Sequence, residues 1–462
     1  MFIGRKHEID ELERLYIQNT FQCIIIWGRR RVGKTTLINE FVKDKETIFF
    51  TGIESSYKDN LEGFSRSIAS LNSNNVEHAP VYQSFQHALD AVYDLAKKRH
   101  IVLVIDEYPY LARSYRPISS LLQKAIDLQF KNSNLFVILC GSSMSFMEKQ
   151  VLGYQSPLYG RRTGQFKIKP FTFYEVRDYY PDMNMYDLAV LYGITGGIPQ
   201  YMACMDASFS LQKNIEASFL STSGYMYEEP HNLMKQELRE PAVYNAIIKA
   251  IATGSSKESE IASKAGLDAG KLGAYVEKLL ELGIVERETP AGSKNSRKTI
   301  YNIKDGMFRF WYTFVPAAML FIQRNRSDRA WNIVEKHLSD YMGKTFEMIC
   351  MDYLWEIYDE LPVAYEEFGR WWGTNPVLRR EEEIDIVAFA GDQAIIGECK
   401  WRNEKVDADV LHLLMERSKL LPYKEYYYMI FSKVGFTDRC INEAEKYGHV
   451  RLVSYEDMVR IK

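Results

Sequence analysis

One stretch of ten residues constrains this chain more than any other part of its sequence. It fits the pattern G-x-x-x-x-G-K-[ST] and reads Trp27-Gly28-Arg29-Arg30-Arg31-Val32-Gly33-Lys34-Thr35-Thr36. The apolar run before it, 23–27, predicts a buried strand, and 36–42 has helical spacing. A strand, a glycine-containing loop and a helix N-terminus form an anion cradle, because the loop N–H groups and the helix dipole both face the bound phosphates.

The loop chemistry predicts ATP and Mg²⁺ as cofactors. Lys34 is expected to reach the β- and γ-phosphates, and the Thr35 hydroxyl is expected to hold Mg²⁺. The residues expected around the nucleotide are Gly28, Arg29, Arg30, Arg31, Val32, Gly33, Lys34, Thr35 and Thr36.

A second buried strand, 101–105, ends in Asp106 and Glu107. Ligands of open α/β sheets bind at the carboxyl ends of the strands. We therefore expect Asp106 in the Mg²⁺ shell and Glu107 to orient or deprotonate the attacking water. A further apolar run ends in two hydroxyls, Ser142 and Ser143, between which the sequence does not choose. Capping of the following helix is the alternative role for these serines.

The length and composition of the chain limit its number of domains, its partners and its compartment. A chain of 462 residues suggests roughly three domains. The net charge of −3 gives no global attraction for nucleic acid, so any such binding needs a local patch. Six dispersed cysteines without a C-x-x-C pair indicate free thiols in a reducing compartment. The N-terminus lacks an apolar signal core, and no uncharged stretch approaches the roughly 18 residues of a membrane span, so we expect a cytoplasmic protein with no membrane partner.

The order of short motifs over about the first 220 residues resembles the archaeal/bacterial ATPase family within the AAA-plus and STAND group. The motifs are the phosphate loop, Ile-Asp-Glu at 105–107, Cys-Gly-Ser-Ser at 140–143, Tyr-Gly-Arg-Arg at 159–162 and Gly-Gly-Ile-Pro-Gln-Tyr at 196–201. The resemblance implies that Ser142 or Ser143 is a sensor of the γ-phosphate or the water. It also implies that Pro199, in the helical lid, lies against the nucleotide base.

Two further groups of residues near the nucleotide are expected on the same basis. The opening segment is similar to that of AAA-like ATPases and would pack against the adenine, which adds Ile3 and Arg5; an ordinary amphipathic first helix is the alternative. Arg161 or Arg162 is placed to act as an arginine finger toward a neighbouring subunit, which would require a homo-oligomer. A solvated basic turn is the alternative for this pair.

The middle of the chain predicts three helices followed by a two-stranded hairpin, which describes a winged helix-turn-helix. The elements are expected at 243–252, 257–264, 271–280, 284–287 and 298–303. DNA is the partner that this motif suggests, with Lys294, Arg297 and Lys298 of the hairpin loop on phosphates. The third helix is nearly neutral, however, and phosphate contacts dominate DNA affinity. A protein-interaction module is therefore the alternative.

The last part of the chain carries carboxylate and lysine side chains whose spacing suggests a second catalytic site. Asp385 lies on one predicted strand, and strand periodicity puts Glu398 and Lys400 on one face of the returning strand. With Glu347 on a preceding helix, the pattern resembles the PD-(D/E)xK nuclease superfamily. Asp385 and Glu398 would then bind Mg²⁺ and activate a water, and Lys400 would stabilise the developing phosphate charge. Paired surface charges on an ordinary hairpin, or an inactive nuclease-like fold, are the alternatives.

The predicted fold class is α/β: a P-loop NTPase with a parallel sheet and a helical lid, a winged helix-turn-helix, and a restriction-endonuclease-like α/β domain. The predicted domains are 1–172 for the ATPase core, 173–235 for the lid, 236–315 for the winged helix, 316–334 for a linker helix and 335–462 for the nuclease-like domain. Our first hypothesis is ATP hydrolysis coupled to DNA binding or cleavage. The second is an ATP-dependent switch or scaffold whose winged helix and inactive nuclease-like domain bind a partner.

Overall fold

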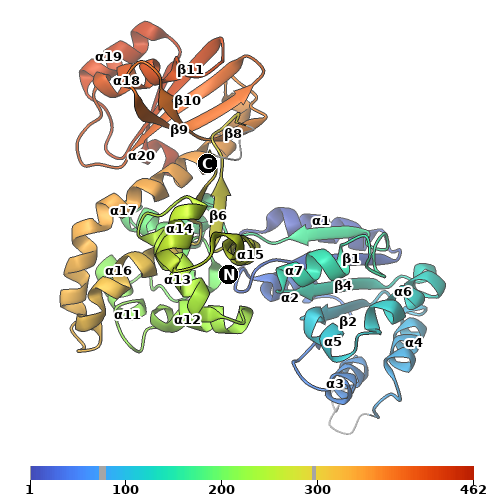
Figure 1. Cartoon of the computed structure of the whole chain (residues 1–462). Helices are drawn as coiled ribbons and strands as arrows, with labels where there is room; N and C mark the ends of the chain where they lie inside the picture. Colours follow the sequence, from blue (N-terminus) through green and yellow to red (C-terminus); the bar gives the residue numbers. More distant parts are fainter. Residues whose placement is uncertain (1, 72–79, 294–297, 462) are drawn as a thin grey trace. The chain divides into compact units, whose positions relative to one another are not determined.

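The computed structural model describes residues 2–71, 80–293 and 298–461. The chain divides into two compact units, which Figure 1 shows in sequence colours. The first unit comprises Met1–Pro170 and Ile198–Gln200, and the second comprises Phe171–Gly197 and Tyr201–Lys462.

The first unit is built on a five-stranded sheet with the order β2-β3-β4-β1-β5. Every neighbouring pair is parallel, so the carboxyl ends of all five strands meet at one edge. This confirms the α/β class predicted for this part of the chain. The strands are β1 (Gln22–Trp27), β2 (Thr47–Thr51), β3 (Val102–Asp106), β4 (Phe136–Gly141) and β5 (Gly164–Lys167).

Helices cover both faces of this sheet (Figure 1). Successive strand side chains point to opposite faces, so Ile25 and Leu139 enter one hydrophobic core while Ile24 and Ile138 enter the other. The first core is completed by α3 to α6 and the second by α1 and α2. The helical elements are α1 (Lys6–Ile17), α2 (Lys34–Val42), α3 (Tyr57–Ser70), α4 (Phe85–Ala96), α5 (Tyr108–Ser114), α6 (Ile118–Leu128), α7 (Met144–Phe146) and the short η1 (Phe130–Asn132) and η2 (Met147–Val151).

The second unit begins with helices. They are α8 (Phe173–Tyr179), α9 (Met185–Thr195), α11 (Leu211–Ser218), α12 (Tyr225–Glu237), α13 (Pro241–Ala252), α14 (Glu258–Ala265), α15 (Ala269–Glu281), α16 (Gly306–Ile322) and α17 (Ser327–Glu356). The short helix α10 (Pro199–Met202) is divided between the units, with Pro199 and Gln200 in the first. The predicted boundaries at residues 316 and 335 fall inside α16 and α17, and the division into five domains stays a prediction. None of the helices within the described ranges combines the length and the apolar character needed to cross a lipid bilayer.

Three of these helices, α13 to α15, precede an antiparallel pair, β6 (Val285–Glu288) and β7 (Ile300–Ile303). The elements therefore follow the predicted order, and their identity as a winged helix-turn-helix stays a prediction. Two of the predicted basic residues, Lys294 and Arg297, lie outside the described residues. The third, Lys298, lies just before β7.

A mixed five-stranded sheet, with the order β12-β11-β10-β9-β8, completes the second unit. Strand β9 is antiparallel to β8 and β10, whereas β10, β11 and β12 run parallel. Strand β8, which comes first along the chain in this sheet, was not predicted from the sequence. The elements are β8 (Glu367–Asn375), β9 (Arg380–Ala390), β10 (Gln393–Lys400), β11 (Glu425–Ser432), β12 (Val450–Ser454), α18 (Ala408–Ser418), α19 (Asp438–Tyr447), α20 (Tyr455–Val459) and η4 (Tyr358–Glu360).

Candidate functional site

The phosphate loop joins β1 to α2, in the context that the sequence predicted. Gly33 has a φ of 87°, a conformation that favours glycine. A Cβ atom at Gly28 would lie 2.4 Å from the carbonyl oxygen of Ile168, so the loop approaches the end of β5 too closely for a side chain there. Both motif glycines are therefore required by the backbone itself.

The Lys34 side chain folds back over this loop and is buried. Its Nζ donates hydrogen bonds to the carbonyl oxygens of Gly28 at 3.0 Å and Arg29 at 2.9 Å. Burial lowers the pKa of the Lys34 ammonium. Both acceptors are neutral, so the positive charge remains available to an incoming phosphate.

Thr35 and Asp106 meet at the carboxyl edge of the sheet, although 71 positions separate them in the sequence. The Thr35 hydroxyl donates to Asp106 Oδ2 at 3.0 Å, and the backbone N–H of Glu107 donates to Asp106 Oδ1 at 2.9 Å. Hydroxyl and carboxylate oxygens are the ligands that Mg²⁺ prefers. The residues present therefore fit a bound Mg²⁺ ion.

Glu107 follows directly, with a φ of 47° that is strained for a residue with a side chain. Its Oε2 accepts a hydrogen bond from the Ser142 hydroxyl at 2.9 Å. Ser143 is the residue before α7, and its carbonyl accepts from the N–H of Met147. The contact with Glu107 thus falls to Ser142, a choice that the sequence left open. A sensor role stays a prediction for either serine.

Pro199, which is predicted to lie against the nucleotide base, lies beside the phosphate loop. A Cβ atom at Gly33 would be 3.7 Å from Pro199 Cγ, and the N–H of Gln200 donates to the Arg31 carbonyl at 3.4 Å. This explains why Ile198–Gln200 groups with the first unit. Within the first unit, the structure therefore places Pro199 and Gln200 beside the phosphate loop.

Two arginines of the predicted nucleotide set make contacts that brace the site. The Arg5 guanidinium donates to the carbonyls of Val32, at 3.3 Å, and Lys169. Arg30 donates to the Tyr110 hydroxyl at 2.8 Å. Arg5 thus ties the phosphate loop to the segment after β5, a contact that the sequence did not reveal. Ile3 lies half-buried before α1, and Thr36 lies in the first turn of α2.

The two candidate finger arginines differ in their contacts. Arg161 forms a forked ion pair with Asp127 of α6, with its Nε 3.0 Å and its Nη2 2.6 Å from Asp127 Oδ2. Arg162 donates to the carbonyl of Leu152 at 3.4 Å. Since Arg161 is engaged within its own unit, Arg162 is the better candidate of the two, and the finger role stays a prediction.

The carboxylates predicted for the second unit lie on adjacent strands. Gly397 of β10 pairs with Ile386 of β9, so the next residue on each strand brings Asp385 beside Glu398. The N–H of Cys399 donates to Asp385 Oδ2 at 2.8 Å, and Lys400 Nζ contacts Glu398 Oε1 at 2.5 Å. Burial raises the pKa of both Asp385 and Glu398. The predicted trio is therefore assembled on one sheet.

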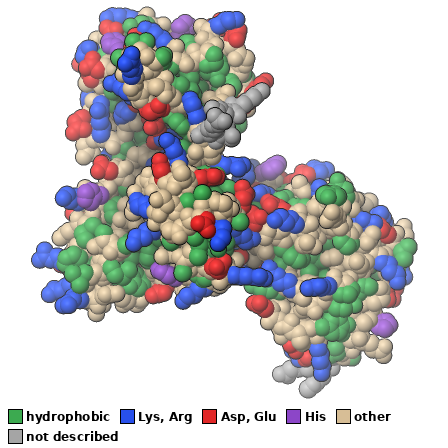
Figure 2. Space-filling model, in the orientation of Figure 1, with side chains coloured by type: hydrophobic (Ala, Val, Ile, Leu, Met, Phe, Trp, Pro, Cys, Tyr) green, Lys and Arg blue, Asp and Glu red, His purple; other side chains and the backbone are tan. Residues whose placement is uncertain are grey.

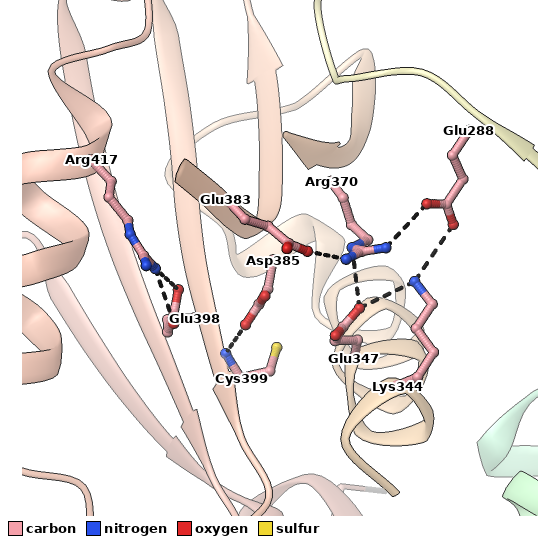
Figure 3. A network of polar contacts seen from close by, with 9 residues as sticks. All are labelled: Glu288, Lys344, Glu347, Arg370, Glu383, Asp385, Glu398, Cys399 and Arg417. Carbon is pink, nitrogen blue, oxygen red and sulfur yellow. Dashed lines mark hydrogen bonds and ion pairs between the residues drawn. The ribbon is translucent and has the colours of Figure 1, made fainter. Parts of the chain in front are cut away.

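Cations hold two of the predicted acids (Figure 3). Glu347 on α17 is 3.2 Å from Lys344 Nζ and 3.4 Å from Arg370 Nε. Glu398 is 3.4 Å from Arg417, in addition to Lys400. The carboxylate donors suit Mg²⁺, but no three His, Cys, Asp or Glu side chains of the described residues gather closely enough to hold a metal ion.

The sequence did not predict that Arg370 and Arg417 would pair with these acids. Arg370 lies on the unpredicted strand β8, and Arg417 lies on α18, where it also pairs with Glu382 at 3.0 Å. The acidic run at 381–383 was the available signal for cationic partners, which Glu382, the buried carboxylate of the run, requires.

Comparisons with known proteins agree with this architecture. Residues 2–205 match the family described as an ATPase domain predominantly from Archaea, and residues 311–411 match a family of archaeal and bacterial proteins of unknown function. An uncharacterized protein of Methanocaldococcus jannaschii is 32% identical over 470 residues, which cover 99% of this chain and 100% of that protein. An uncharacterized ATP-binding protein of the same organism is 50% identical over 46 residues, or 10% of this chain and 78% of that protein.

Among solved structures, the Walker-type ATPase of Pyrococcus abyssi is similar in fold. It superimposes with a TM-score of 0.51 at 20% sequence identity, covering 67% of this chain and 96% of that one.

Proposed function

This chain belongs to the same protein family as the Methanocaldococcus jannaschii relative that it matches from end to end, and we propose that it is a Mg²⁺-dependent ATPase that couples its nucleotide state to the binding or cleavage of DNA. Residues 2–205 match an archaeal-type ATPase domain, whose class activity is ATP binding and hydrolysis. The observation that carries the ATPase part of the proposal is the contact between Thr35 and Asp106, which joins the phosphate loop to the acidic strand end.

The residues of the first unit have separate tasks in this mechanism. Lys34 leaves its carbonyl acceptors and neutralises charge on the β- and γ-phosphates. Thr35 and Asp106 would hold Mg²⁺, which supplies further neutralisation of the phosphate oxygens when bound. Glu107 orients the attacking water or takes its proton, and the Ser142 hydroxyl fixes the position of that carboxylate.

Two features support a DNA transaction in the second unit. The order α13, α14, α15, β6, β7 is that of a winged helix-turn-helix. Asp385, Glu398 and Lys400 lie together on β9 and β10, and carboxylates next to a lysine suit metal-assisted hydrolysis of a phosphodiester.

A nucleotide-dependent switch, in which the second unit binds a protein partner, is the second candidate. The observation that favours it is the pairing of Glu347 and Glu398 with arginine and lysine side chains. Figure 2 shows acidic and basic side chains interspersed on the face in view, which suits a protein partner better than a nucleic acid, because phosphate contacts need clustered basic side chains.

The test is cleavage of single-stranded, duplex and branched DNA with Mg²⁺ or Mn²⁺, with and without ATP. We expect cleavage by the wild type and its loss in the Asp385→Ala/Lys400→Ala double variant. The matched control is Asp392→Ala/Lys424→Ala, which removes an exposed ion pair of the same domain, with 2.6 Å between its charged atoms. Absence of cleavage on every substrate would contradict the nuclease half of the proposal and favour the switch.

A further inference from the structure

Five charged side chains from four elements form one cluster in the second unit, which we call the Arg370 cluster (Figure 3). Strand β6 contributes one residue, α17 contributes two, and β8 and β9 contribute one each. The members are Glu288, Lys344, Glu347, Arg370 and Glu383.

The two cations of the cluster are shared between two carboxylates. Arg370 lies 3.2 Å from Glu288 and 3.4 Å from Glu347, and it also contacts Glu383. Lys344 lies 3.2 Å from Glu347 and 3.5 Å from Glu288. The Arg370 side chain is only 16% exposed and that of Glu347 only 15%, so solvent screens these pairs weakly.

Glu347 is the third acid of the predicted nuclease-like motif, whose predicted metal ligands are Asp385 and Glu398, whereas Glu288 belongs to the β6–β7 hairpin. The backbone connects the hairpin to the same place, because the N–H of Ala291 donates to the Arg370 carbonyl at 2.8 Å. With three carboxylates and two cations, any shift of Arg370 and Lys344 toward Glu288 leaves Glu347 less neutralised. The hairpin and the candidate metal site therefore compete for the same two cations.

We propose that Arg370 and Lys344 are resident counter-ions that keep a divalent cation away from Glu347, and that Glu288 of the hairpin sets how firmly they do so. A metal ion and a guanidinium compete for the same carboxylate oxygens, so binding of one weakens binding of the other. Occupation of the metal site then requires Arg370 to shift toward Glu288 and Glu383, and Lys344 to shift toward Glu288. The inference rests on the proposed metal site and adds its regulation by β6.

The experiment measures Mn²⁺ binding to the nucleotide-free full chain by calorimetry and by the electron paramagnetic resonance of the bound ion. Asp385→Ala, made alone and in each variant, identifies the binding that belongs to this site. We expect Arg370→Gln to tighten that binding roughly tenfold, because it removes one buried positive charge beside a candidate ligand. Glu288→Gln, which leaves both cations to Glu347, is expected to weaken it about threefold.

The matched control is Arg439→Gln, which removes an arginine paired with Asp407 and Asp409 in the same domain. Its Mn²⁺ affinity should equal that of the wild type. Melting curves establish that each variant is folded, and Glu288→Gln serves as the test if Arg370→Gln is not. Equal Mn²⁺ affinity in the wild type and the folded variants would overturn the inference, and DNA cleavage by the wild type would then leave the proposed function standing. No Mn²⁺ binding at this site in any protein would overturn the inference and the proposed metal site together.

Discussion

The phosphate loop and the β9–β10 hairpin both hold a lysine near carboxylates, but the two lysines have different partners. Lys34 donates to the backbone carbonyls of Gly28 and Arg29. Lys400 instead contacts the Glu398 carboxylate, which Arg417 also approaches. One lysine is held by neutral groups of its own loop, and the other by a charge of opposite sign.

This difference sets what each site requires of a ligand. A triphosphate that reaches Lys34 replaces two hydrogen bonds to neutral carbonyls with charge-assisted ones, which are stronger. A cation that reaches Glu398 must compete with two positive side chains in a mostly buried place, and breaking buried ion pairs is costly. The first site is ready for its ligand, whereas the second must first rearrange its own ion pairs.

The largest expected effect tests the first side of this comparison. Lys34→Ala should lower ATP turnover by at least about a thousandfold, because the charge on the transferred phosphoryl group loses its lysine. Phosphate release at saturating ATP measures this. The control is Lys43→Ala, which removes an exposed lysine at the other end of α2 and should leave turnover unchanged. Unchanged turnover in Lys34→Ala would refute the role of the loop.

The ease of predicting the two sites differs for a physical reason. The phosphate loop is contiguous in sequence, and the strand-end rule was enough to place Asp106 near Thr35. The sequence could not choose between Ser142 and Ser143, because the choice depends on which hydroxyl the end of β4 directs at Glu107.

The Arg370 cluster was beyond prediction because its members come from four elements. Strand β8 lacks a regular alternation, and its pairing with β9 is irregular between Gly369 and Trp371. Without that strand, nothing in the sequence placed Arg370 near Glu347. The pairing of Asp385 with Glu398 and Lys400 was predictable, since it needs only one hairpin and a period of two.

Glu107→Gln tests the phosphate-loop site again, with a smaller expected effect on ATP turnover. The amide keeps the size of the side chain but cannot take a proton, so turnover should fall by about a hundredfold while ATP remains bound. Binding of a fluorescent ATP analogue, measured beside phosphate release, separates the two steps. Glu148→Gln is the control, because Glu148 is an exposed partner of Lys167 in the same unit. Turnover at the wild-type rate would remove Glu107 from the mechanism.

A smaller effect, on stability rather than on turnover, tests the β9–β10 side of the comparison. Arg417 pairs with Glu382 at 3.0 Å and Glu398 at 3.4 Å, and these glutamate side chains are only 3% and 6% exposed. Arg417→Gln leaves each of them with one cation, Arg380 or Lys400, so we expect a loss of about 2 kcal/mol in the free energy of unfolding. Urea unfolding, followed by circular dichroism, measures it.

The same unfolding measurement on Lys34→Ala gives the decisive contrast. Lys34 is bonded to neutral carbonyls, so its removal strands no buried charge, and the unfolding free energy should change by less than about 1 kcal/mol. Arg439→Gln, at an exposed ion pair, should shift the urea midpoint by no measurable amount. If Lys34→Ala and Arg417→Gln destabilised the chain equally, the two sites would not differ in how their charges are held. A loss of stability confined to Arg417→Gln, with a loss of turnover confined to Lys34→Ala, would mean that one site keeps its charge for a ligand while the other uses its charges to hold the fold.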